Sequence, residues 1–325
     1  MVSTESVTTK PTFLWIADPF DSLDHETDTT IRLLRESIFR GNSNFWAEVK
    51  SAEWRFDQSV WARHVTPEFA GSSNVSLSNY ERYSVSRIDL IILRVDPPVS
   101  AAYAGLISSL AHSFIATGRD PERWIINSPT LMLIQKSRLL ALRSGLAPTS
   151  ILSSEIRDIA DFSRQVGAVV LKSLDGHAGK GISLIKRGSN RATIAKLVSK
   201  TQSIGSEAVI AQRYLANHLI SEKRVLFVDG APIFACKKLF AEGLFPPSLA
   251  SGNCASSTAL EKAEIQTCLR VGEILKHLNL RVAGVDLIDG WVTDVNFISP
   301  GLLVEMEMVA GFNLAGRILR SIESG

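Results

Sequence analysis

The fold is decided by residues 168–185, which read AVVLKSLDGHAGKGISLI. Two strand-like apolar runs flank a loop in which Gly176, Gly179 and Gly181 allow backbone N–H groups to approach phosphate oxygens closely. The loop is neither a Walker A motif nor a dinucleotide-binding fingerprint, because a strand rather than a helix follows it. Lys172, at the end of the first strand, can point at the same phosphates. A tight hairpin could use these glycines for structure alone, so the prediction of phosphate binding depends on the lysine and the loop together.

A second group of polar residues lies on the strands that we expect at residues 281–287 and 291–298. Asp286 interrupts an apolar strand, whereas Asp294 and Asn296 are two residues apart and therefore face the same side. If the two strands pair, three oxygen ligands converge, a set that suits Mg²⁺ shared with nucleotide phosphates. The alternative is a row of solvent-facing strand residues. That alternative fits Asp286 least, because a charge among apolar neighbours has to be compensated.

Upstream of the loop, strand and helix patterns alternate. Apolar runs at residues 12–17, 88–95 and 124–126 predict strands, and periodicity at residues 30–38 and 101–117 predicts helices. This order indicates an open α/β domain with a mainly parallel sheet. Ligands of such sheets lie beyond the carboxyl ends of the strands, where Asp18 and residues 94–96 fall. Asp-Pro also simply terminates a strand, and spacing alone favours that interpretation.

Downstream of the loop, we expect a further strand at residues 209–212 and a hairpin over residues 223–234. Helices are expected at residues 156–165, 260–278 and 310–322. Residues 241–257 form a polar segment rich in Pro, Ser and Gly with little periodicity, and the polar residues 1–12 are expected to be a flexible leader.

Composition excludes several classes of protein. The 325 residues are 45% hydrophobic and 21% charged with a net charge of +2, which is typical of a globular chain of about two domains. No Lys/Arg run exceeds two residues, so we expect no nucleic-acid partner, and no apolar run has the length of a membrane span. The three cysteines lack Cys-x-x-Cys spacing. We therefore expect incidental thiols, no zinc site and a reducing cytoplasm.

From Asp18 almost to the C-terminus, the chain resembles the bacterial glutathione synthetases of the ATP-grasp superfamily. The matching segments are LRVDPP (93–98), KSLDG (172–176), AQRYL (211–215), KRVLFVDG (223–230), GVDLI (284–288) and TDVNFISP (293–300). The resemblance implies an N-terminal open α/β (pre-ATP-grasp, Rossmann-like) domain followed by a two-lobed α+β ATP-grasp domain. The implied parts are a leader at 1–12, the substrate domain at 13–127, the small lobe at 128–210 and the C-terminal lobe at 211–325, with a lid at 241–257.

The resemblance also implies an activity: ATP-dependent activation of a carboxylate as an acyl phosphate, followed by amide formation with an amine. ATP and Mg²⁺ (or Mn²⁺) are the implied cofactors, small acids and amines the substrates, and a dimer or tetramer the usual assembly. Site residues carried over by position are Lys136, Lys172, Gly176, Gly179 and Gly181 for phosphates; Gln212, Tyr214 and Leu215 for adenine; Arg224 and Lys172 for catalysis; Asp286, Asp294 and Asn296 for metal; and Asp18, Arg94, Asp96, Ser299 and Pro300 for substrate.

The chain departs from the family at positions where arginines would bind carboxylates. No arginine lies between Arg224 and Arg270, so the lid has none, and Val304 stands before Glu305 where the family has arginine. Lys237 and Lys238 are candidates to compensate in part. Two alternatives therefore stay open: a ligase for another small acid or peptide, and a nucleotide-binding paralogue without catalysis. The retained lysines, Arg224 and metal ligands argue against the second.

Overall fold

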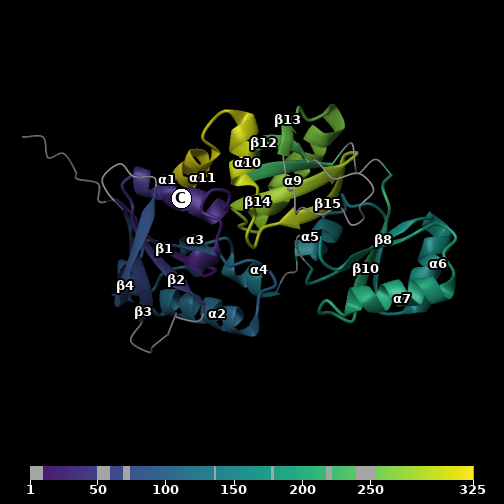
Figure 1. The fold of residues 1–325 in the computed structure, drawn as a ribbon, viewed down its shortest axis with the longest axis horizontal. Coiled ribbons are helices and arrows are strands. Elements are labelled where there is room, and N and C mark those ends of the chain that lie inside the picture. The colour runs from purple at the N-terminus through teal and green to yellow at the C-terminus, as the bar shows by residue number, and fades with distance from the viewer. Residues whose placement is uncertain are drawn as a thin grey trace, which may run out of the picture.

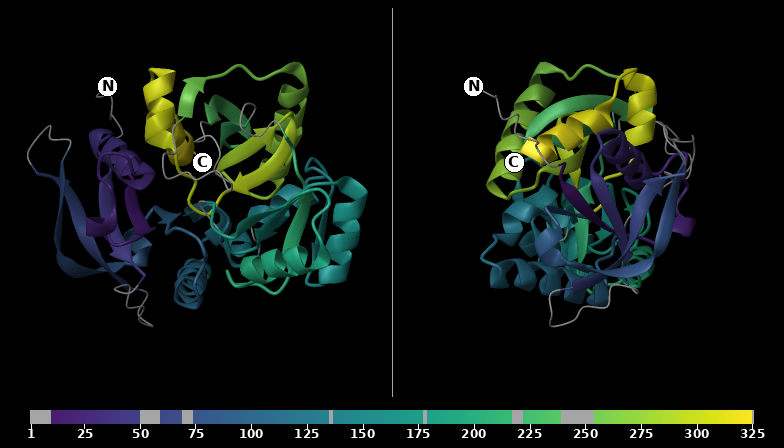
Figure 2. Two further views of the ribbon diagram at one scale, coloured as in Figure 1. Left: turned by 45° about the vertical axis from the view of Figure 1, so that its right-hand side comes forward. Right: turned by 90° about the vertical axis from the view of Figure 1, so that its left-hand side faces the viewer.

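The computed structural model describes residues 10–49, 59–68, 74–134, 137–176, 179–216, 222–238 and 254–324. Its strands form three sheets of six, four and five strands. Figures 1 and 2 show the five-stranded sheet between the other two along the longest axis of the molecule. Most of the expected leader (1–12), at 1–9, and most of the expected lid (241–257), at 241–253, lie outside the described residues, and Thr12 already begins the first strand.

The N-terminal sheet has the strand order β4-β3-β2-β1-β5-β6, in which β2, β1, β5 and β6 are parallel. Strand β1 is buried on both faces: Phe13 and Trp15 pack with the helix α1, whereas Leu14 and Ile16 pack with α2. Helices on both faces explain the uninterrupted apolar run of this strand. The bounds are β1 Thr12–Ala17, β2 Ser43–Glu48, β3 Ser59–Pro67, β4 Val75–Ser84, β5 Leu90–Arg94, β6 Ile125–Ile126, α1 Thr29–Phe39, α2 Ala101–Ala116, α3 Pro121–Trp124 and α4 Pro129–Ile134.

The four-stranded sheet, in the order β7-β10-β8-β9, is antiparallel throughout and is packed against two helices. The helix α6 has its apolar residues at 156, 159 and 162, the spacing of a one-sided helix, and Ile159 and Phe162 join the core of this sheet. The bounds are β7 Ser150–Ser153, α6 Ile156–Val166, β8 Val169–Ser173, β9 Ile182–Ile185, α7 Arg191–Gln202 and β10 Val209–Arg213.

The five-stranded sheet has the order β13-β12-β11-β14-β15, and all its pairs are antiparallel. Its strands β11 and β14 are buried at every position, and α5 packs on β15. Figure 1 shows α5 between this sheet and the four-stranded sheet. The bounds are α5 Ser137–Arg143, β11 Lys223–Val228, β12 Ala231–Lys238, β13 Cys254–Ser257, α9 Lys262–His277, β14 Val282–Ile288, β15 Trp291–Asn296, α10 Leu303–Ala310 and α11 Leu314–Ser324.

The two largest apolar cores each contain buried residues of both the N-terminal domain and the C-terminal lobe. Asn127 fixes the junction, because its side chain donates to the carbonyls of Val282 (2.8 Å) and Phe297 (2.7 Å) and accepts from the Val282 N–H (2.9 Å). An ion pair between Arg32 and Glu307 joins α1 to α10 at 2.6 Å. The N-terminal domain and the C-terminal lobe are therefore joined by a continuous apolar core.

The α/β class and the two-part architecture predicted from the sequence are confirmed, but several details differ. The antiparallel pair β3–β4 was not predicted, nor were the strands β2, β7 and β13. The helix expected at 310–322 begins later, at Leu314, because residue 310 ends the preceding helix α10, which stops at Gly311 in a left-handed conformation (φ 71°). Cys236 is disulfide-bonded, so the expectation of an incidental thiol is wrong there, whereas Cys268 is a free, buried thiol.

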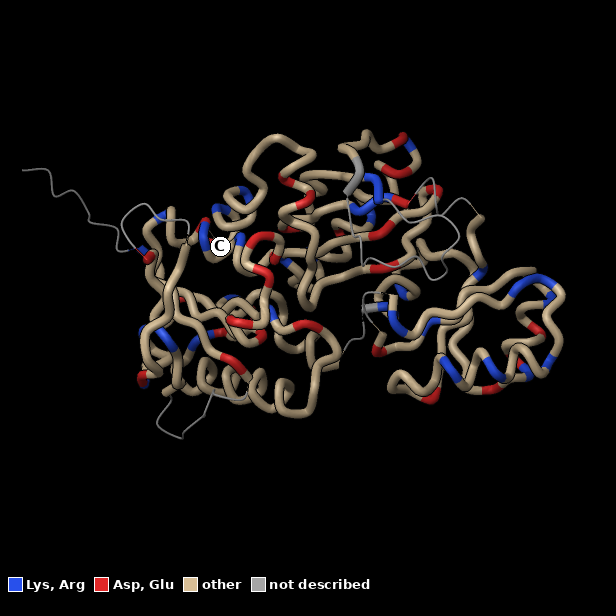
Figure 3. The backbone as a smooth tube through the Cα atoms, viewed as in Figure 1, with Lys and Arg blue, Asp and Glu red and all other residues tan. Residues whose placement is uncertain are grey.

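Within the described part of the chain, no helix has the length and apolar character needed to cross a bilayer. Basic and acidic positions are interspersed along the backbone (Figure 3).

Candidate active site between the two C-terminal sheets

The predicted hairpin of β14 and β15 is confirmed, and it places two carboxylates opposite each other. Asp286 and Asp294 are cross-strand partners, and Asn296 is opposite Gly284. Cross-strand partners share a face of the sheet, and residues two apart on a strand do so as well. The structure therefore brings the three predicted metal ligands to one face of the hairpin.

Asp286 is held by basic side chains. Arg224, its cross-strand neighbour on β11, donates from Nε to Oδ1 (2.5 Å) and from Nη2 to Oδ2 (2.8 Å). Lys238 donates to the same Oδ2 (3.3 Å) and to Glu222 Oε1 (2.5 Å). Burial alone would raise the pKa of Asp286, but the two cations outweigh it and lower the pKa to about 2. Gly284 leaves room for the arginine, since a Cβ there would lie 3.1 Å from Arg224 Cδ.

Lys172 connects the two C-terminal sheets. It lies on β8 of the four-stranded sheet, and its Nζ donates to the carbonyl of Thr293 on β15 at 2.8 Å. Burial lowers the pKa of its ammonium group; Asp294 opposes this shift, and the positive charge of Arg138 adds to it. The predicted phosphate lysine and the predicted metal hairpin are thus in direct contact.

The glycine-rich loop is tightly closed between β8 and β9. The N–H of Ser173 donates to the carbonyl of Gly181 at 2.8 Å, and Gly181 has a φ of +70°. A Cβ added at Gly176 would lie 2.1 Å from the carbonyl oxygen of Lys180, so only glycine fits there. Gly179 is also left-handed, with φ +80°. The glycines serve the tight hairpin, and the same compact backbone lies beside Lys172.

The segment predicted to receive adenine begins in β10 and leaves the four-stranded sheet after it. Gln212 is buried, and its side-chain amide donates to Ser150 Oγ at 3.1 Å. The N–H of Tyr214 donates to the carbonyl of Ala168 at 3.0 Å. Leu215 follows directly, where the chain runs towards the five-stranded sheet. These residues thus lie on the connection between the two lobes.

The five residues predicted to face the substrate form one cluster at the carboxyl ends of β1 and β5. Asp18 Oδ2 accepts from the N–H of Asp96 (2.9 Å), and burial raises the pKa of Asp18. Arg94 is buried, and it donates from Nη1 to the carbonyl of Pro300 (3.0 Å). The hydroxyl of Ser299 donates to the carbonyl of Arg94 (3.3 Å). Because Ser299 is three residues beyond Asn296, the cluster and the β14–β15 hairpin are linked by a short segment.

One predicted phosphate ligand and most of the lid cannot be placed. Lys136 lies outside the described residues. The structure adds Arg138 and Glu222, to which the sequence reasoning gave no role, and it places Lys238, a candidate to compensate for the missing arginines, against Asp286 instead. Glu222 and Lys238 could have been found from the hairpin register, because Lys238 is two residues beyond Cys236, the partner of Arg224. Nothing in the local sequence of Arg138 indicates its contacts.

Oxygen donors of the hairpin suit a hard divalent cation. The side-chain nitrogen of Asn296 donates to the Gly284 carbonyl (3.3 Å), and that bond leaves the amide oxygen for a ligand. Asp294 keeps a partly exposed carboxylate, with 24% of the side chain exposed. Asp286 would have to share its oxygens with Arg224. No group of three or more His, Cys, Asp or Glu side chains with metal-binding geometry occurs among the described residues, so the fit depends on the asparagine.

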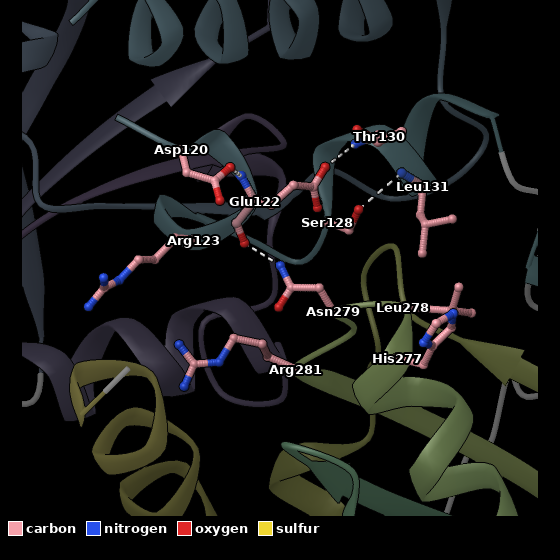
Figure 4. A pocket seen from close by; sticks show the side chains of 10 residues that line it. All are labelled: Asp120, Glu122, Arg123, Ser128, Thr130, Leu131, His277, Leu278, Asn279 and Arg281. Atoms are coloured by element: carbon pink, nitrogen blue, oxygen red, sulfur yellow. Dashed lines mark hydrogen bonds between the residues drawn. The ribbon is translucent and has the colours of Figure 1, made fainter. Parts of the chain in front are cut away.

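A wide pocket of about 780 Å³ lies elsewhere, between α3, α4 and the end of α9 (Figure 4). Its polar groups largely bond to one another: Asp120 caps α3 through the N–H of Glu122 (3.0 Å), and Asn279 donates to the carbonyl of Glu122. Arg281, on its floor, is paired with Asp229 at 2.8 Å. None of the predicted site residues lines it, so it is separate from the candidate active site.

Comparisons with known proteins identify the family and the fold. Residues 12–132 match the prokaryotic glutathione synthetase N-terminal domain, and residues 138–311 match the prokaryotic glutathione synthetase ATP-grasp domain. A glutathione synthetase of Parasynechococcus marenigrum is 29% identical over 315 residues, which cover 96% of this chain and 98% of the relative. The D-cycloserine synthetase DcsG has a similar fold, with a TM-score of 0.64 at 15% identity over 96% of this chain and 99% of that chain. The ATP-grasp ligase PsnB gives a TM-score of 0.61 at 15% identity over 97% and 99%.

Proposed function

The chain belongs to the prokaryotic glutathione synthetase family and is an ATP-dependent carboxylate–amine ligase of the ATP-grasp class, and we propose that it acts through an acyl phosphate formed between its two C-terminal sheets. The observation that carries this proposal is the convergence of basic side chains from three elements on the β14–β15 hairpin. Lys172 comes from β8, Arg138 from α5 and Arg224 from β11. Positive charge beside oxygen ligands is what a triphosphate with a divalent cation requires.

We assign the nucleotide to this region. Lys136, Lys172 and the loop of Gly176, Gly179 and Gly181 would hold phosphates, and residues 212–215 would receive adenine. Asp286, Asp294 and Asn296 would hold Mg²⁺, with Mn²⁺ as a substitute. The metal held by these residues would neutralise charge on the phosphates. The solved PsnB complex contains Mg and ADP, and its similar fold supports this assignment.

The reaction needs positioning and charge neutralisation rather than a nucleophilic side chain. An oxygen of the substrate carboxylate attacks the γ-phosphorus, and the bond to the β-phosphate oxygen breaks so that ADP leaves with the electron pair. The amine then attacks the acyl carbon, the carbon–oxygen bond to phosphate breaks, and the amine loses its proton to solvent. Arg224 would stabilise the transferred phosphoryl group, which requires it to loosen one of its bonds to Asp286.

We place the acid and amine near the cluster of Asp18, Arg94, Asp96, Ser299 and Pro300. Ser299 of this cluster is three residues beyond the end of the β14–β15 hairpin. The charges around this cluster determine which acid can bind there. The lid contributes no arginine to them, and Val304 contributes no charge. Lys238 was a candidate to replace the missing charge, but it is bonded to Glu222 and Asp286. A ligase for a small acid or peptide other than the glutathione precursor is therefore the second candidate function.

Phosphate release from Mg-ATP tests the proposal and separates the candidates. We expect release only when an acid is added, first with γ-glutamylcysteine plus glycine and then with a panel of other acids and amines. Glutathione among the products would identify the first candidate, and release with another pair would identify the second. ATP binding without release across the panel would contradict a ligase and favour a nucleotide-binding paralogue. A cytoplasmic location and assembly as a dimer or tetramer stay predictions, the latter open to sedimentation analysis.

A further inference from the structure

Arg138 has contacts that a surface arginine would not have. It lies on α5, and only 5% of the residue is exposed. Its Nη1 donates to the carbonyl of Ser173, and its Nη2 to the carbonyl of Lys180 (3.5 Å). These two carbonyls lie at the opposite ends of the glycine-rich loop. One guanidinium group therefore bridges the end of β8 and the last part of the loop, two residues before β9.

The third nitrogen of the guanidinium faces the metal hairpin. The Nε of Arg138 is buried and has no hydrogen-bond partner among the described residues, and it lies 4.0 Å from Asp294 Oδ2. A buried N–H without a partner is costly, and such groups are rare unless a function retains them. Because α5 packs on β15, the arginine is also fixed to the lobe that carries the hairpin.

A physical reason for these contacts follows from the charges. A carbonyl oxygen that faces a phosphate repels it, and the carbonyls of Ser173 and Lys180 lie at the two ends of the loop that follows Lys172. A guanidinium group has several N–H donors in a rigid fork and no acceptor. It can therefore donate to two such carbonyl oxygens at once and offset the partial negative charge of both. An ammonium group would reach only one of them in the same geometry.

We propose that Arg138 is the positioning residue that holds the glycine-rich loop closed against the β14–β15 hairpin, so that loop and hairpin bind the nucleotide phosphates as one unit. This inference rests on the proposed function, because it requires that the loop binds phosphate. Arg138 acts through the loop backbone, and it sets nucleotide affinity rather than the affinity for the acid or the amine.

The test uses Arg138→Gln and Arg138→Lys in the full chain, with Arg143→Gln as the matched control. Arg143 is an exposed arginine of the same helix. We expect Arg138→Gln to weaken binding of a fluorescent ADP analogue, and to raise the KM for ATP, by about tenfold to a hundredfold, the range for hydrogen bonds to charged groups. The KM values for acid and amine should change less than twofold. Arg138→Lys should rescue part of the loss, and the control should bind like the unsubstituted chain.

Hydrogen exchange gives a readout that does not depend on turnover. In Arg138→Gln, peptides that contain residues 173–176 and 179–182 should exchange faster, whereas those of α6 and α9 should not change. Gly176→Ala approaches the same contact from the loop side, because its Cβ would lie 2.7 Å from Arg138 Nη1. Its effect and that of Arg138→Gln should therefore be less than additive.

Three results would count against the inference. If Arg138→Gln binds the ADP analogue like the unsubstituted chain, the positioning role is wrong, although the ligase function stands. A uniform rise of all three KM values together with faster exchange throughout the chain would show a purely structural role. If the unsubstituted chain itself fails to bind nucleotide, the proposed function fails and this inference fails with it. Should Arg138→Gln not fold, Arg138→Lys decides between these outcomes.

Discussion

Replacing Lys172 by methionine should lower acid-dependent phosphate release on the order of a hundredfold to a thousandfold, the usual effect of removing one donor to a developing charge. Methionine fills a similar volume but supplies no ammonium group. The lysine also donates to the carbonyl of Thr293, so a modest loss of stability, about 1–3 kcal/mol, should accompany the change. Steady-state kinetics measure the first effect, and urea unfolding measures the second.

The matched control for this change is Lys186→Met, at an exposed position directly after β9. It removes a lysine from the same lobe without touching the contact between the sheets. The control should keep full activity and stability. Turnover by Lys172→Met within threefold of the unsubstituted chain would show that the lysine only makes a structural contact between the lobes. The phosphate assignment would then be wrong.

Breaking the Arg224–Asp286 pair should give the largest combined effect. Arg224→Met leaves Asp286 buried with Lys238 as its remaining cationic partner, and loss of one partner of a buried pair costs about 3–5 kcal/mol. Activity should fall by about a thousandfold or more, because the arginine is proposed to contact the transferred phosphoryl group. Asp286→Asn should have a similar effect on activity.

The double variant Arg224→Met with Asp286→Asn separates folding from catalysis. With both charges gone, no uncompensated charge of this pair remains, and part of the lost stability should return. Lys238 keeps its bond to Glu222 in either background. Activity should not return, because both proposed roles are missing. Recovery of activity along with stability would mean that the pair serves the fold alone. Urea unfolding and kcat/KM for ATP are the two measurements.

The sequence predicted the β14–β15 hairpin well because its determinants are local. The turn at Asp289 and Gly290 has left-handed conformations (φ 50° and 78°), which Asp-Gly favours, and the strands on either side pair as expected. The alternation of Asp294 and Asn296 then determines which face they share. Strand β1 was equally predictable, because burial on both faces demands a continuous apolar run.

Contacts that depend on tertiary packing could not be predicted. Arg138 reaches the carbonyl of Ser173, 35 residues away, only because α5 packs between two sheets. The bonds of Arg224 to Asp286 follow from the register of β11 on β14, which no local pattern specifies. The pair β3–β4 was missed because β4 is largely exposed and polar, so its alternation is weak.

The central claim is that a substrate carboxylate oxygen bonds to the γ-phosphorus of ATP. The most direct measurement uses the acid identified by the phosphate-release panel, with ¹⁸O in its carboxylate, and mass spectrometry of the phosphate released during amide formation. An acyl phosphate requires that one labelled oxygen appears in each phosphate produced. Amide formation with unlabelled phosphate would contradict the account, because the carboxylate would then have been activated by another route.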